Sequence, residues 1–171
     1  TSTYILGDAT VFFEAMEQID TVVFELHETM IIDSVVLNGS KMSNFIHEDG
    51  LIKLIPEESL LTDSIHYIKV KYAGGPVSDG FFTGINNRRD YTYGKNVTYT
   101  LSEPFQSSSW FPVKQNLLDK ADSVKVSIIT DSTLMGGSNG LLSNIQELPE
   151  GKLRYNWESR YPIAYYLISI A

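Results

Sequence analysis

Hydrophobic and polar residues alternate at every second position along much of the chain. The segment 64–74 shows this most clearly, because Ile68 and Val70 lie on one side of the alternation and Lys69 and Lys71 lie on the other. A period of two predicts β-strands that bury one face and expose the other. The same pattern predicts further strands at residues 10–15, 21–26, 31–39, 51–56, 96–101, 123–130, 152–159 and 163–171.

Turn residues separate these predicted strands. Asn38-Gly39 is the strongest short hairpin signal, and residues 47–50 and 150–151 also indicate turns. Residues 76–95 are predicted to form a long loop, and no segment carries the apolar stripe of a helix. The sequence therefore predicts an all-β fold: an antiparallel, saddle-like β-sandwich of two or more packed sheets, with long loops and little helix. It is predicted to form a single domain over residues 1–171.

Composition narrows the possible functions. The 171 residues carry a formal net charge of −8, and no basic stripe is present to displace phosphate counterions, which argues against binding to nucleic acid. The absence of cysteine excludes disulfides, thiolate zinc sites and cysteine nucleophiles. No apolar run approaches the roughly 18 residues of a membrane span, so no span is predicted.

The histidines do not form a complete metal motif. A His-Glu pair begins at His27 and again at His47, as in the zinc motif H-E-x-x-H. However, Ile31 and Leu51 occupy the positions of the second histidine, and the motif needs two histidines one helical turn apart. His66 lies in a predicted strand and is interpreted as structural. We therefore predict no metal site in this chain.

A nucleophile motif is also missing. Residues 107–109 form a run of serines, but the G-x-S-x-G elbow that exposes a catalytic serine is absent. From its residues alone, the chain is predicted to be an all-β module without a complete active site, and no catalytic residue is assigned to it.

The segment 102–128, SEPFQSSSWFPVKQNLLDKADSVKVSI, resembles part of the N-terminal domain of the aminopeptidase N family of zinc metallopeptidases, which includes leukotriene-A hydrolase. In that family an acidic or amide loop residue precedes an aromatic-proline pair and an acidic strand entry. Glu103, Phe111-Pro112 and residues 119–122 occupy these positions.

Other segments extend the resemblance over essentially the whole chain. Residues 72–74 followed by 79–82 are similar to a Y-x-G and G-F-Y passage of the family. Residues 161–167 are similar to its closing P-I-x-x-Y-L strand, after which the catalytic domain begins. Residues 7–13 and 33–39 fit its opening strands.

The resemblance implies the non-catalytic N-terminal domain of a zinc-dependent aminopeptidase, an enzyme that removes N-terminal residues from peptides. Zinc and the H-E-x-x-H helix would lie in the catalytic domain, which this domain caps and which this chain lacks. The partners would be that catalytic domain and the amino terminus of the peptide substrate, and the chain alone would be inactive. Residues 113–116 lack the cysteine and aspartate of many relatives, which suggests a bacterial branch and export to the periplasm or the exterior.

The same resemblance gives Glu103 a role. The family's N-terminal domain lends one acidic or amide residue to the active site, where it binds the free α-amino group of the substrate, and Glu103 aligns with it. A carboxylate suits this task because charge-assisted hydrogen bonds are roughly twice as strong as neutral ones. Since the domain would lie beside a catalytic domain, we also expect an exposed apolar patch around Phe105, Trp110, Phe111 and residues 76–82.

An alternative function of another class stays open. The chain could be a free-standing β-sandwich module that binds carbohydrate or protein through exposed aromatic side chains. Its contact surface would contain Trp110, Phe111, Tyr91, Tyr93 and Tyr99. An H-E-x-x-H helix encoded downstream would discriminate between the two functions.

Overall fold

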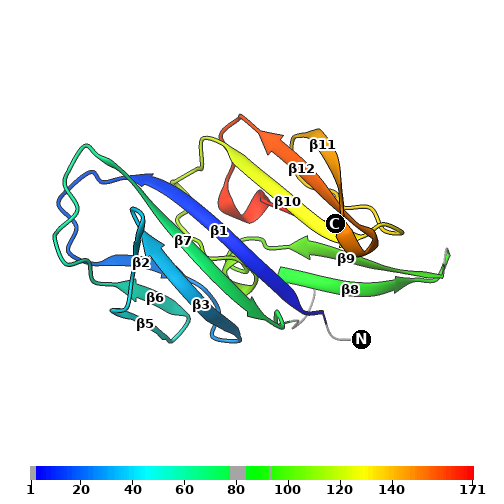
Figure 1. Cartoon of the computed structure of the whole chain (residues 1–171), viewed down its shortest axis with the longest axis horizontal. Helices are drawn as coiled ribbons and strands as arrows, with labels where there is room; N and C mark the ends of the chain where they lie inside the picture. Colours follow the sequence, from blue (N-terminus) through cyan, green and yellow to red (C-terminus); the bar gives the residue numbers. More distant parts are fainter. Residues whose placement is uncertain (1–2, 78–83, 93) are drawn as a thin grey trace. The chain divides into compact units, whose positions relative to one another are not determined.

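The computed structural model describes residues 3–77, 84–92 and 94–171, and these contain β-strands and three short 3-10 turns but no α-helix (Figure 1). The all-β prediction is confirmed. None of the helical segments in this part of the chain is long and apolar enough to cross a membrane. The strands are β1 (Ile5–Glu14), β2 (Val22–Glu25), β3 (Met30–Leu37), β4 (Ser40–Lys41), β5 (Phe45–Glu48), β6 (Leu51–Leu54), β7 (Ile65–Gly74), β8 (Gly84–Asp90), β9 (Lys95–Leu101), β10 (Val124–Asp131), β11 (Leu141–Leu148) and β12 (Lys152–Ser159). The 3-10 turns are η1 (Ser107–Ser109), η2 (Pro149–Gly151) and η3 (Tyr165–Leu167).

The chain folds as two compact units. The first contains residues 1–78 and 107–115, and the second contains residues 79–106 and 116–171. The chain therefore passes from one unit to the other several times, and each unit is described separately. A single domain over residues 1–171 stays a prediction.

Two antiparallel sheets form the first unit, in the orders β1-β7-β3-β4 and β2-β6-β5. Their inner side chains share one core, in which Val35, Ile68 and Val70 of the larger sheet are buried together with Phe24 and Ile52 of the smaller one. Burial of each such side chain contributes about 1.5–3 kcal/mol. The unit is a β-sandwich, as the alternation predicted.

The predicted hairpin turns are present. Asn38 (φ 48°) and Gly39 (φ 88°) join β3 to β4, and Asp49 (φ 52°) and Gly50 (φ 71°) join β5 to β6. Two successive residues with positive φ match the twist of the flanking strands, which is why Asn-Gly and Asp-Gly favour such turns.

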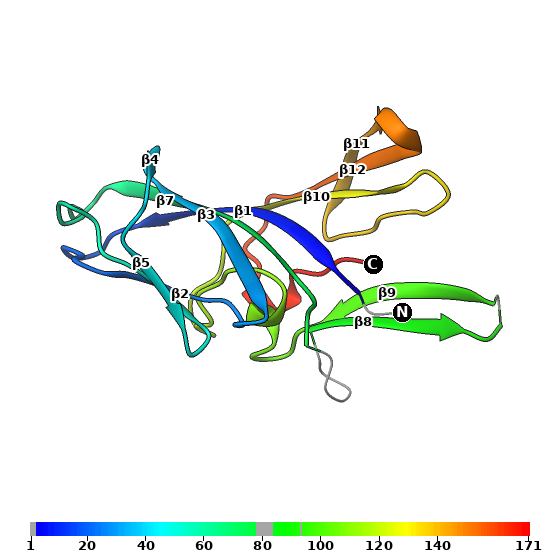
Figure 2. The same cartoon turned by 60° about the horizontal axis from the view of Figure 1, so that its bottom comes forward.

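The second unit contains the sheet β10-β12-β11 and the two-stranded hairpin β8-β9 (Figure 2). A loop between β10 and β11 is held to the sheet, because the Tyr155 hydroxyl donates to the Leu134 carbonyl at 3.0 Å and the Trp157 indole donates to the Gly136 carbonyl at 3.0 Å. Aromatic residues of β12 thus serve both as core side chains and as hydrogen-bond donors.

Two sequence predictions were wrong in this unit. Residues 163–171 do not form a strand. Ile163 and Ile170 make single bridges to Ala121 and Ser138, because the chain turns between them through η3. Within the predicted loop 76–95, residues 84–90 form β8, which pairs with β9 through its backbone although its side chains do not alternate. Residues 78–83 and 93 lie outside the described residues.

A glycine at the start of β11 gives a stability test. Gly140 has a φ of +88°, and a Cβ there would lie 2.1 Å from the Glu158 carbonyl oxygen. Gly140→Ala should lower the free energy of unfolding by about 1–2 kcal/mol for the left-handed backbone and by a further ~1–3 kcal/mol for the overlap. Urea denaturation measures the loss.

Gly94→Ala is the matched control, because Gly94 also has a positive φ (+64°) but, apart from its chain neighbours, no described residue has an atom within 4 Å of its added Cβ. It should lose only the backbone part. Equal losses in the two variants would contradict the close approach of β11 and β12 at Gly140.

Candidate functional site

The candidate anchor Glu103 lies in a turn that follows β9. Residues 103–106 form the turn, and the Gln106 amide donates to the Ser102 carbonyl at 3.0 Å. The Ser102 side chain is buried whereas Glu103 is exposed, and the Glu103–Pro104 peptide bond is cis. The carboxylate is therefore presented to solvent from a short hydrogen-bonded turn.

The C-terminal segment braces this turn. The Tyr165 hydroxyl donates to the Pro104 carbonyl at 2.5 Å, and Tyr165 itself is buried in η3. Nearby, the Thr100 amide donates to the Ile170 carbonyl at 3.0 Å, and the Ile170 amide donates to the Thr100 hydroxyl at 2.9 Å. Two segments that resemble family motifs, residues 102–106 and 161–167, are thus joined by a partly buried hydrogen bond.

The aromatic pair beyond the turn belongs to the first unit and is packed there. Trp110 is 8% exposed, its carbonyl accepts from the Tyr72 hydroxyl at 2.7 Å, and Phe111 packs against the core. The prediction that Trp110 and Phe111 lie in an exposed patch was wrong, because their rings are needed to fill the sandwich. Phe105 is 53% exposed, as predicted, and most of the loop 76–82 lies outside the described residues.

A clamp that the sequence did not predict fixes the same segment. Glu25 at the end of β2 pairs with Val113, with backbone hydrogen bonds of 2.7 and 3.0 Å. The Glu25 carboxylate also accepts hydrogen bonds from the backbone amide of Gln115 at 3.2 Å and from its side-chain amide, while the side-chain Oε1 of Gln115 accepts the backbone amide of Ser107 at 3.2 Å. The only sequence signal was an acidic residue inside the apolar run 21–26.

The histidines make local contacts. His47 Nε2 lies 2.8 Å from the Leu26 carbonyl oxygen, His27 Nδ1 lies 3.0 Å from the Thr29 hydroxyl, and His66 Nδ1 lies 2.9 Å from the Asn38 amide. Among the described residues no three His, Asp or Glu side chains are grouped so that they could hold a metal ion.

Burial controls the ionisation of the tyrosine that holds the aromatic segment. Burial raises the pKa of Tyr72 far above its ordinary value, and the Asp8 carboxylate raises this pKa further. The phenol therefore stays protonated at physiological pH and remains the donor to Trp110. This group acts as a structural donor, and Glu103 is the exposed charge that the braced turn presents.

Comparison with solved structures identifies the fold. An M1 zinc metallopeptidase from Deinococcus radiodurans matches 99% of this chain with a TM-score of 0.84 and 20% identity, and a mutant bound to the substrate Tyr-Ser-Ala matches 99% with a TM-score of 0.88 and 20% identity. The chain has the fold of part of an M1 zinc metallopeptidase. It spans about 38% of the length of those two enzymes.

A two-domain M1 zinc metallopeptidase mutant bound to L-arginine matches 98% of this chain and 37% of its own, with a TM-score of 0.87 and 19% identity. No protein-family model matches the sequence, and no curated protein matches it. The resemblance that the sequence motifs indicated is thus confirmed at the level of the fold.

The brace on the Glu103 turn can be tested with Tyr165→Phe. Removing the hydroxyl leaves the Pro104 carbonyl without its donor, so the free energy of unfolding should fall by about 1 kcal/mol. Hydrogen exchange of the Gln106 amide, which closes the turn, should become faster.

Tyr166→Phe is the control, because Tyr166 stacks edge-on against Tyr165 at 5.5 Å but makes no hydrogen bond through its hydroxyl to another described residue. It should change neither stability nor exchange. Unchanged exchange of Gln106 in Tyr165→Phe would show that the brace does not hold the turn.

Proposed function

We propose that this chain is the N-terminal β domain of a zinc-dependent aminopeptidase, an enzyme that removes N-terminal residues from peptides. The observation that carries the proposal is the match of nearly the whole chain to about 38% of the length of M1 zinc metallopeptidases, one of which is bound to the substrate Tyr-Ser-Ala. The zinc and the hydrolytic groups would lie in the catalytic domain of the full-length protein, which this domain caps.

Glu103 is proposed to bind the α-amino group of the peptide substrate. An α-ammonium group needs carboxylate or carbonyl acceptors at fixed positions, and charge-assisted hydrogen bonds supply both strength and direction. Glu103 is exposed, and its turn is closed by Gln106 and braced by the buried Tyr165. An anchor must be held rigidly if it is to position a reacting bond, and these contacts support that role.

Exposed apolar side chains in the second unit support a covering partner. Leu141 is 80% exposed and Ile145 is 51% exposed on β11, an edge strand of its sheet, and Met135 is 84% exposed in the loop that precedes β11. Exposed apolar side chains on an edge strand are typical of an interface. The partner proposed for them is the catalytic domain of the same protein.

The alternative of an aromatic binding module loses much of its support. Trp110 is buried, Phe111 packs against the core, and Tyr99 is half-buried. Tyr91 is 92% exposed and Tyr93 lies outside the described residues. Trp110 and Phe111, the two residues that chiefly motivated this function, are therefore packed into the sandwich and do not form a contact surface.

The test uses the full-length protein, whose gene should encode an H-E-x-x-H helix downstream of residue 171. Glu103→Ala should lower kcat/KM for peptides with a free amino terminus by roughly ten- to a hundredfold, because a hydrogen bond to a charged group is worth about 1.5–3 kcal/mol. Glu103→Gln should lower it less, because an acceptor oxygen remains. The melting temperature should barely change, since the carboxylate is exposed.

Two controls make this result specific. Glu57→Ala removes another exposed carboxylate and should leave kcat/KM unchanged, and an N-acetylated peptide should show no further loss in Glu103→Ala. Full activity of Glu103→Ala on free-amine peptides would refute the anchor. A gene without the downstream helix would refute the aminopeptidase assignment.

The 171-residue chain produced alone gives a separate expectation. It should hydrolyse no aminoacyl reporter substrate and bind no stoichiometric zinc, because the metal and the hydrolytic groups are assigned to the other domain. Elemental analysis of the purified chain and a reporter assay measure both. Stoichiometric zinc together with peptidase activity would overturn the proposal.

A further inference from the structure

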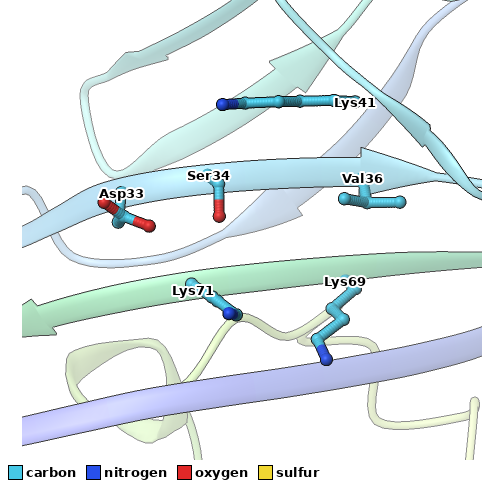
Figure 3. Close-up of a pocket in the computed structure, with 6 residues that line it drawn as sticks. All are labelled: Asp33, Ser34, Val36, Lys41, Lys69 and Lys71. Atoms are coloured by element: carbon cyan, nitrogen blue, oxygen red, sulfur yellow. The ribbon is translucent and has the colours of Figure 1, made fainter.

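A shallow depression lies on the outer face of the four-stranded sheet of the first unit. Its residues come from segments of the chain that do not include the Glu103 turn. It has a volume of about 330 Å³. Figure 3 shows Asp33, Ser34 and Val36 on β3, with Lys41 on one side and with Lys69 and Lys71 of β7 on the other. These positions alternate with the core positions of β3 and β7, so the depression faces solvent.

A β-bulge builds one wall of this depression. Ile32 pairs with Tyr72 and Ser34 pairs with Lys71, so Asp33 is an extra residue in β3. In a regular strand two consecutive residues point to opposite faces. The bulge instead lets both Asp33 and Ser34 line the outer face. Bulges commonly re-aim side chains near functional sites.

The charges of the depression are only partly neutralised. Lys69 forms an ion pair with Asp8 at 3.2 Å, and in Figure 3 its ammonium group points towards β1. Lys41, Lys71 and Asp33 form no ion pair with any other described residue. Two free ammonium groups therefore flank one free carboxylate on a chain whose net charge is −8. The excess of positive charge attracts an anion to this face.

The six side chains together favour an anion that also carries hydroxyl groups. Lys41 and Lys71 offer charge-assisted donors for a carboxylate, and Asp33 accepts hydrogen bonds from hydroxyl groups. Ser34 both donates and accepts, and Val36 offers an apolar contact for a ring face. The depression is open to solvent, and its volume of about 330 Å³, at the lower end of the range of small-molecule pockets, can admit one sugar ring.

We propose that this depression binds an acidic sugar, with a uronate as its chemical class. The carboxylate of the sugar lies between Lys41 and Lys71, and its hydroxyl groups donate to Asp33 and exchange hydrogen bonds with Ser34. The inference rests on the outer face of one sheet and is independent of the aminopeptidase function.

Calorimetric titration of the 171-residue chain with three probes tests the proposal. D-galacturonate carries both a carboxylate and hydroxyls, acetate carries only the carboxylate, and D-glucose carries only the hydroxyls. Galacturonate should bind at least about tenfold more tightly than acetate, and glucose should not bind, because each recognition element adds roughly a factor of ten. Equal affinities for galacturonate and acetate would overturn the assignment to a sugar.

Variants assign the binding to these residues. Lys71→Gln and, independently, Lys41→Gln should each weaken galacturonate binding about tenfold, and Asp33→Asn should weaken galacturonate but not acetate. Lys53→Gln is the matched control, because Lys53 is an exposed lysine on β6 of the other sheet and its loss should change nothing.

Three outcomes of these measurements would contradict the proposed sugar site. Binding that survives both Lys71→Gln and Lys41→Gln would place the sugar elsewhere, and an equal loss in Lys53→Gln would indicate general charge attraction. Tighter binding of galacturonate by Asp33→Asn would refute the role of the carboxylate. All variants change exposed side chains, and an unchanged melting curve verifies that each is folded.

Discussion

The register of β7 is the constraint on which the first unit depends. This strand pairs with β1 on one edge and with β3 on the other, so its alternation sets both faces of the four-stranded sheet. Ile68, Val70 and Tyr72 face the core, and Lys69 and Lys71 face solvent. A slip by one residue would exchange these faces and bury ammonium groups without partners, which is far more costly than the aliphatic burial is favourable.

The same register connects the strands of the sandwich to residues 107–115 of the first unit. Because Tyr72 points inward, its hydroxyl can reach the Trp110 carbonyl and hold the aromatic pair in place. The clamp between Glu25 and Gln115 fixes the other end of that segment. Side chains with long-range partners thus order residues 107–115, a stretch of the first unit that has almost no secondary structure of its own.

Strands with one buried face could be predicted from the sequence, because alternation records burial directly. β7 and β10 belong to this class, whereas β8 and β11 were missed because their side chains are polar or exposed on both faces and only backbone pairing defines them. Residues 163–171 were misread because a short apolar run fits a buried turn as well as a strand.

At the candidate site, too, some features could be predicted from the sequence and others could not. Glu103 could be singled out because a family motif places it, but the brace on its turn and the clamp on residues 107–115 could not be predicted. Tyr165 and Pro104 are 61 residues apart, and Glu25 and Gln115 are 90 residues apart. No local pattern records a contact over that separation. The outer depression was missed for a related reason: the bulge at Asp33 shifts the register, and the period of two does not reveal a bulge.

A fold specified by buried alternation leaves the exposed positions free to change. This explains how the chain keeps a TM-score of 0.88 at only 20% identity with an M1 metallopeptidase, since the core requires a pattern and a volume rather than particular residues. The outer face of β3 and β7 contributes little to the core, and its lysines serve the fold by keeping that face in solvent. The likeness of the fold concerns the buried face, so it does not decide what this outer face binds.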